Sequence, residues 1–129
     1  MIPRYWRYVD QNYAAGPILL VAHPGATLAT LTLTVTEPSY VRVMGGASLS
    51  TTVADGVGTL ALNKAGAGLD SADFHAHVAF GSTSSYKSFV TTQQPADGAV
   101  TYTLMGVKWT AGSTMNGYQN LIQLDIARA

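Results

Sequence analysis

The sequence predicts an all-β fold, and three observations carry that prediction. Apolar and polar residues alternate with a period of two through most of the chain after residue 16, as they do in strands that bury one face. Gly, Pro, Asn and Asp recur between the alternating runs, where turns are expected. No window of a dozen residues has the apolar spacing of an amphipathic helix. About eight or nine short strands at regular spacing favour a sandwich or a barrel.

The clearest strand covers residues 30–36, where Leu31, Leu33 and Val35 alternate with threonines. Threonine is β-branched and suits a pleated surface. Pro38 ends this run because proline cannot donate a ladder hydrogen bond. The strands expected from the pattern are, in order, 17–22, 30–36, 40–44, 47–53, 57–62, 74–80, 86–92, 99–109 and 120–127.

Glycines set most of the expected boundaries between these strands. Gly45 and Gly46 are expected to end the strand 40–44, and Asp55-Gly56 suits a hairpin turn. A glycine-rich loop is expected over 64–73, and Gly106 is expected to mark a bulge. The residues expected to dominate the buried faces, themselves or through their immediate neighbours, are Leu31, Leu33, Val35, Phe74, Val78, Phe80, Leu104, Leu121 and Ile126.

Composition limits the classes of partner. The chain has 129 residues, its 7 Lys and Arg balance its 7 Asp and Glu, and 11% of residues are charged. Without a positive excess there is no electrostatic basis for a nucleic-acid partner. The sequence has no run of about 20 apolar residues, the length that a membrane-spanning helix needs, and so does not predict insertion into a membrane. Low charge and strand faces rich in Thr, Ser and Ala predict association with copies of the same chain in closed symmetry.

The residue types also argue against catalysis. The absence of cysteine excludes thiolate ligands, cysteine nucleophiles and disulfides. The sequence has no Gly-x-Ser-x-Gly elbow and no phosphate-binding loop. We therefore predict a protein that is not an enzyme and holds no cofactor. His75 and His77, two residues apart on an expected strand, are weak candidates for a metal site. The alternative is a pair of histidines that make ordinary hydrogen bonds.

Two groups of residues are candidates for binding. Residues 1–16 are expected to form an irregular arm before a β-domain over 17–129, and the arm carries Arg4, Tyr5, Trp6, Arg7 and Tyr8. Aromatic residues and arginine are enriched at protein–protein contacts. These five residues predict a segment that docks onto a larger particle. The alternative, in which the rings pack back onto the domain's own sheet, stays open.

The second group combines an aromatic platform with side-chain amides, as sugar-binding sites do. Trp109, Asn116 and Tyr118 lie near one another in the sequence, with Gln119 and Asn120 beside them. They predict a glycan-binding site. The alternative is that Trp109 ends a strand and caps the core while Asn116-Gly117 makes a tight turn. His23, followed by Pro24 and Gly25, is expected in a turn.

The order of elements resembles a known family. An apolar–threonine strand leads through Pro38-Ser39-Tyr40 to a strand ending in Gly45-Gly46, and a late Val100–Leu104 strand precedes a closing Leu121–Ile126 strand. This order is similar to the small jelly-roll domains, related in shape to the C1q and tumour-necrosis-factor heads, of bacteriophage head and tail fibres. The resemblance covers residues 22–129. It implies an antiparallel jelly-roll-like β-sandwich whose last strand is central in one sheet.

The resemblance also implies a function. It predicts a non-catalytic virion structural protein, a head or tail fibre, spike or decoration subunit with a role in host attachment, that assembles as a homotrimer. The arm would bind other virion proteins, and the absence of cysteine suits assembly in the host cytoplasm before the chain reaches the virion. The alternative is a lectin-like carbohydrate-binding module that recognises a cell-surface glycan.

Overall fold

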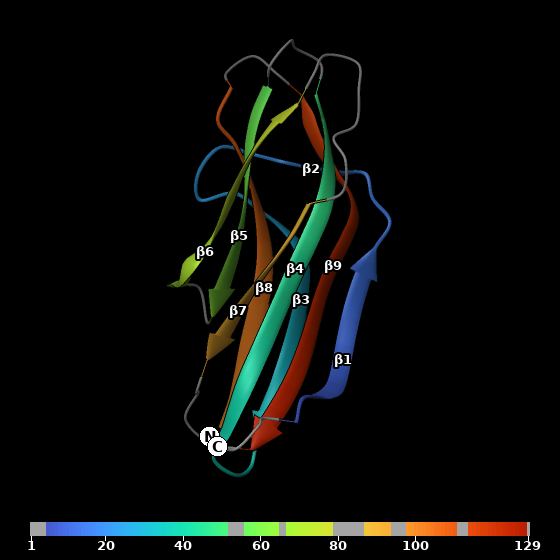
Figure 1. The fold of residues 1–129 in the computed structure, drawn as a ribbon. Helices are drawn as coiled ribbons and strands as arrows, with labels where there is room; N and C mark the ends of the chain where they lie inside the picture. Colours follow the sequence, from blue (N-terminus) through green and yellow to red (C-terminus); the bar gives the residue numbers. More distant parts are fainter. Residues whose placement is uncertain are drawn as a thin grey trace.

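The computed structural model describes residues 5–51, 56–64, 67–78, 87–93, 98–110 and 114–128, and the side chains of these except 56, 67–78 and 87–93. The described residues form two antiparallel sheets packed as a sandwich (Figure 1). No helix among them is long and apolar enough to cross a membrane. The strands are β1 (Arg7–Ala14), β2 (Ile18–Leu19), β3 (Ala26–Val35), β4 (Ser39–Thr51), β5 (Gly56–Lys64), β6 (Ala67–Val78), β7 (Lys87–Gln93), β8 (Gly98–Lys108) and β9 (Met115–Arg128).

The strand order is that of a jelly roll. Sheet I has the order β1-β9-β4-β7, with β2 also paired to β9, and sheet II has the order β3-β8-β5-β6. Apart from β2, the first strand pairs with the last, β3 with β8, β4 with β7, and β5 with β6. This is the pairing of one long hairpin rolled into two sheets. The predicted all-β jelly-roll-like sandwich is therefore confirmed, and β9 lies between β1 and β4 as the resemblance implied (Figure 1).

The core lies between the two sheets, where the alternating apolar residues meet. Leu33, Val35 and Leu104 are buried as predicted, and Leu31 is half-buried against the same cluster. On β9 the immediate apolar neighbours of Leu121 and Ile126 that are buried are Ile122 and Ala127, and Leu124 between them is buried as well. Ile126 is only half-buried. The side chains of Phe74 and Val78, and all of Phe80, lie outside the described residues.

Two of the expected strand boundaries and the bulge expected at Gly106 are wrong, and packing explains the two cases that involve a glycine. Strand β4 continues through Gly45, and packing explains the glycine, because a Cβ there would lie 2.9 Å from both Leu104 Cδ1 and Leu62 Cδ2. Gly106 likewise makes room for neighbouring side chains, and the register shift lies on β3 between Thr27 and Ala29. The expected loop 64–73 is shorter than predicted, because β6 begins at Ala67 and pairs with β5 directly.

The expected irregular arm is also wrong over Arg7–Ala14, which forms β1 at an edge of sheet I. The long strand β9 offers β1 a partner, and Val9 packs against the core. Asn12 Nδ2 donates a hydrogen bond of 2.9 Å to the carbonyl oxygen of Thr30 on β3. Strand β1 therefore belongs to the sandwich and links its two sheets at one side.

Residues 15–25, the crossing segment, pass from sheet I to sheet II and place one side chain in the core. Leu20 N donates to Met115 O over 2.8 Å. Lys108 N donates to Val21 O over 2.8 Å on the opposite sheet. The side chain of Leu20 between them is 1% exposed. Gly106 leaves the space that this side chain fills, since a Cβ there would lie 2.9 Å from Leu20 Cγ.

Tyr102 is a buried polar group whose removal is expected to stabilise the domain. Its hydroxyl has no hydrogen-bond partner among the described residues, and burial raises the pKa of Tyr102 to about 12. An unsatisfied buried hydroxyl costs about 1–3 kcal/mol, so we expect Tyr102→Phe to raise the free energy of unfolding by about 1 kcal/mol. Urea unfolding at pH 7 measures this, with the exposed Tyr13→Phe as the control.

The same group gives a pH dependence whose sign is fixed. The pKa of Tyr102 is higher in the folded state than its ordinary 10.0, so above that pH the unfolded chain releases the proton first. Below pH 10 the titration of Tyr102 does not change the stability of the wild type, and as the pH rises from 10 towards about 12 it lowers that stability progressively. The gain in stability from Tyr102→Phe should therefore increase over that range. The assignment is contradicted if Tyr102→Phe and the wild type have the same free energy of unfolding at pH 7 and at every pH up to about 12.

Candidate functional site

Trp109 directly follows β8 and is both half-exposed and held in place. The residue is 51% exposed, and its indole Nε1 donates a 2.5 Å hydrogen bond to Thr59 Oγ1. Its backbone N donates to Val57 O over 3.0 Å. Val57 N in turn donates to Thr110 Oγ1 over 2.8 Å. The indole is thus fixed against β5 while about half of the residue faces solvent.

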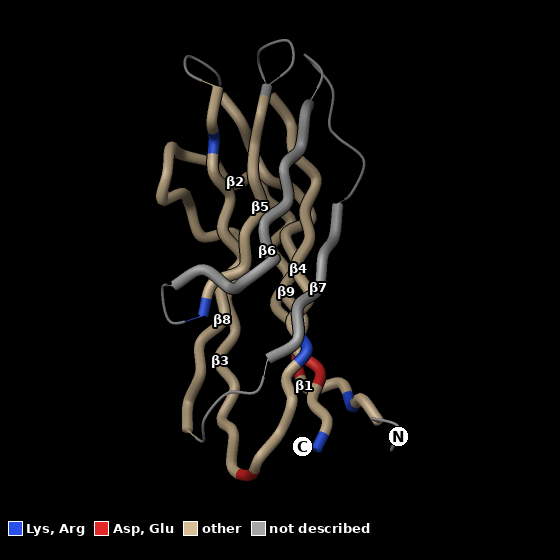
Figure 2. Tube along the Cα trace, turned by 60° about the vertical axis from the view of Figure 1, so that its left-hand side comes forward, with Lys and Arg blue, Asp and Glu red and all other residues tan. Residues whose placement is uncertain are grey.

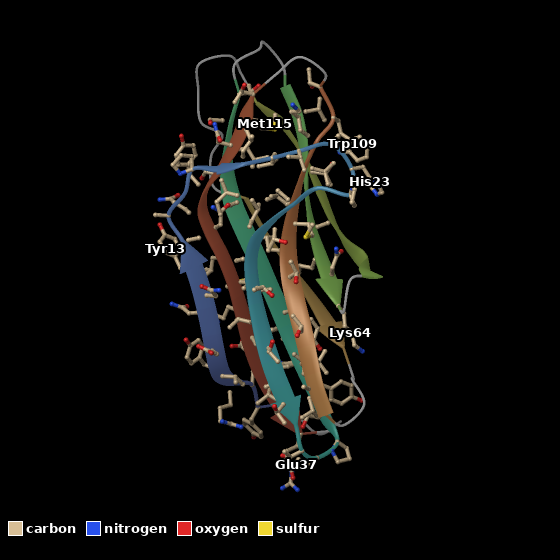
Figure 3. The ribbon with its side chains drawn as sticks, turned by 180° about the vertical axis from the view of Figure 1, so that it is seen from behind. Tyr13, His23, Glu37, Lys64, Trp109 and Met115 are labelled. Atoms are coloured by element: carbon tan, nitrogen blue, oxygen red, sulfur yellow. The ribbon has the colours of Figure 1, made fainter. Side chains whose placement is uncertain are left out.

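His23 lies against this indole. The two ring centroids are 6.0 Å apart with an interplanar angle of 29°, and Figure 3 shows the two side chains next to each other at one side of the sandwich. The expected turn at His23 is present, because Gly25 N donates to Ala22 O over 2.9 Å. Gly25 is required there, since its φ is +102° and a Cβ would lie 2.8 Å from Gly106 O.

We call Trp109, His23 and the neighbouring Val21, which is 42% exposed, the indole platform. The crossing segment supplies two of these residues and the end of β8 supplies the third. Trp109 was predicted from the sequence as a site residue, but His23 was not predicted as its partner. The local sequence does not predict the contact between Trp109 and His23, because the pairing of Val21 with Val107 brings the two residues together.

The other predicted glycan-binding residues lie elsewhere. Asn116 and Tyr118 are on β9 in sheet I, opposite Ser50 and Ser48. They alternate with Gly117, whose Cβ position faces Leu28 in the core, so the two half-buried side chains lie on the outer face of sheet I. The structure therefore does not bring them to Trp109, and the expected tight turn at Asn116-Gly117 is part of a strand instead.

The two residues after Tyr118 have opposite environments. Gln119 is exposed and has a φ of 52°, at the shift in register between β9 and β4. The bulge turns Asn120 into the core, where it is 0% exposed. Asn120 Nδ2 donates to Ala14 O and to Gly117 O, both over 3.1 Å. Asn120 therefore ties the end of β1, at Ala14, to β9.

The predicted docking residues divide into packed and exposed side chains. Trp6 lies against its own sheet, with its ring centroid 4.5 Å from Arg42 Cζ, and Arg42 Nη2 is 2.7 Å from Asp125 Oδ2. Tyr5 is 82% exposed and Tyr8 is 54% exposed. Arg7 is the exposed first residue of β1, and Arg4 lies outside the described residues.

The candidate metal-binding histidines lie on β6. His75 is paired in register with Thr59 and His77 with Val57, so the backbone places both positions near the strand that contacts Trp109. Their side chains are outside the described part of the structure. Within that part, no group of three or more His, Asp or Glu residues is arranged to hold a metal ion.

Comparisons with known proteins give a similarity of fold. No protein-family model matches the chain, and no curated protein matches its sequence. One similar solved structure is the carbohydrate-binding module CBM36 in complex with calcium and xylotriose. It has a TM-score of 0.45 and 15% sequence identity, over 90% of this chain and 99% of that chain.

Proposed function

We propose that this domain is a non-catalytic carbohydrate-binding module whose ligand stacks on the indole platform. The observation that carries the proposal is that Trp109 is 51% exposed while its ring nitrogen is bonded to Thr59. An open aromatic face offers apolar area to the C–H face of a sugar ring. Because the indole is already held, binding a ligand immobilises little additional side-chain freedom.

The neighbouring side chains support a neutral sugar as the ligand. The imidazole of His23 has two nitrogens that donate or accept hydrogen bonds, and it lies beside the ring on which the sugar would stack. Trp109 and Val21 carry no charge, and the platform includes no carboxylate or ammonium group. We therefore expect neutral glycans to bind in preference to anionic ones.

The proposal is tested by replacing Trp109 with alanine and measuring binding to xylan, cellulose, chitin and mannan by affinity electrophoresis and calorimetry. We expect the wild type to bind at least one of these. Trp109→Ala should weaken that binding at least about tenfold, equivalent to about 1.4 kcal/mol. Trp109→Phe, which keeps an aromatic face, should retain part of it. Circular dichroism establishes that each variant is folded.

Tyr13→Ala is the matched control, because Tyr13 is 54% exposed on β1 at the opposite side of the sandwich (Figure 3). This variant should bind as the wild type does. If no polysaccharide of the panel binds to the wild type, the proposed function is wrong. If Tyr13→Ala weakens binding as much as Trp109→Ala, the platform is not the site.

The role as a virion structural subunit, in the host cytoplasm during assembly and in the virion afterwards, stays a prediction. The exposure of Tyr5, just before β1, and of Tyr8, on β1, supports a contact with another virion protein. The homotrimer is likewise a prediction. Docking is best examined by changing these two side chains, because removing the arm would also remove β1. The two functions are compatible, since a fibre subunit that binds a surface glycan would perform both.

A further inference from the structure

The outer face of sheet II carries an ordered array of threonines. Thr30, Thr32 and Thr34 on β3 are exposed, and their partners on β8 are Thr103, Thr101 and Ala99. Residues directly opposite in an antiparallel pair project from the same face. The members of this surface, which we call the threonine face, are Thr27, Thr30, Thr32, Thr34, Ala99, Thr101, Thr103 and Met105.

Hydroxyl groups on this face are bonded within the sheet. Thr32 Oγ1 and Thr101 Oγ1 are 2.9 Å apart. Thr30 Oγ1 donates to Tyr102 O over 3.1 Å and lies 3.3 Å from Thr103 Oγ1. Covering these groups leaves their hydrogen bonds intact, so the desolvation penalty is small. The γ-methyl groups and the aliphatic carbons then contribute apolar area to a contact.

The threonine face also lacks charge. None of its eight residues is ionisable, and β3 and β8 are uncharged along their length except at Lys108, the last residue of β8 (Figure 2). Glu37 lies beyond the end of β3, and Arg42 and Asp125 pair with each other on sheet I. Exposed sheets commonly carry Lys or Glu to oppose association. This face has no such group.

We propose that the threonine face packs against another copy of this chain. The formal net charge of the chain is zero, so two copies approach without net electrostatic repulsion. The uncharged face matches the same face of a second copy better than it matches a charged partner. The proposal does not rest on sugar binding, because none of the eight residues of the threonine face belongs to the indole platform.

The area of the threonine face determines how strongly two copies of the chain are expected to associate. Strands β3 and β8 together span about 10 Å by about 30 Å at the usual spacings, or about 300 Å² per copy. A standard specific interface buries about 800 Å² per partner. We therefore expect weak association that depends on concentration. A mass of two copies or of three, the number that the family resemblance implies, both agree with the proposal.

Sedimentation velocity from about 10 to about 500 µM, the range for a weak interface, tests the proposal without any sugar present. The average mass of the wild type should rise with concentration. Thr32→Lys places a charge at the centre of the face and should keep the mass at that of one chain. Thr32→Val keeps the branched shape and should associate at least as well as the wild type.

Gln11→Lys, which adds the same charge at an exposed position on β1 of sheet I, is the control and should associate as the wild type does. Thr101→Lys on the paired strand replaces Thr32→Lys if that variant does not fold. A wild type that stays at the mass of one chain up to the highest concentration overturns the proposal. Equal loss of association in Gln11→Lys and Thr32→Lys overturns it as well, because the contact would then not be on this face.

Discussion

Replacing Leu20 by alanine is expected to lower the free energy of unfolding by about 3 kcal/mol, within the range for buried leucines. Leu20 is 1% exposed, and the backbone on either side of it bonds to a different sheet. The substitution opens a cavity where the crossing segment closes the sandwich. Denaturant unfolding measures the loss. Leu19→Ala, at a neighbouring residue that is 52% exposed, should lose less than about 1 kcal/mol.

A second substitution tests whether Leu20 and Gly106 share one space. In the wild type a Cβ at Gly106 would lie 2.9 Å from Leu20 Cγ, so Gly106→Ala should cost about 1–3 kcal/mol. In the Leu20→Ala background the same methyl enters the cavity. The double variant should therefore be more stable than the sum of the single effects by at least about 1 kcal/mol. Simple additivity would show that glycine is present there for another reason.

Asn120→Asp is expected to cost at least about 3 kcal/mol at pH 7, although it changes only one atom of the side chain. Asn120 Nδ2 donates to Ala14 O and Gly117 O in a site that is 0% exposed. A carboxylate cannot donate to either carbonyl oxygen, and its charge would be buried without a partner. Unfolding in urea at pH 7 measures the cost.

The pH dependence separates this explanation from a simple loss of packing. Burial raises the pKa of the introduced carboxyl above its value of about 3.9 in the unfolded chain. The cost of Asn120→Asp should therefore be smallest near pH 3 and grow as the pH rises towards 7. Asn116→Asp, on the outer face of the same strand, should show little of this effect. An equal cost at pH 3 and pH 7 would contradict the assignment.

Local patterns predicted the strands well and the glycines poorly. Alternation is a property of neighbouring residues, so Leu33 and Val35 on β3 could be placed in the core from the sequence alone. The role of a glycine depends on distant residues. Gly45 lies within β4, and a glycine is needed there because Leu62 and Leu104 occupy the space that a side chain would fill. The local sequence shows neither contact.

The candidate site could be predicted only in part, for a similar reason. Trp109 and Tyr118 are close in the sequence, but β8 and β9 belong to different sheets, so the chain separates them. His23 is distant in the sequence and lies against the indole. Strand β1 was missed because its pattern of exposed residues is irregular, and its conformation is determined by β9 as a partner.

The central position of β9 has a consequence for the order in which the domain forms during translation. Every strand of sheet II precedes residue 109, so these strands leave the ribosome before β9 does. Strands β1 and β2 lack their partner until residues 115–128 have left the ribosome. Until then the apolar inner face of sheet II has no complete sheet I to cover it. We therefore expect sheet I to be completed last, after the strands of sheet II have left the ribosome.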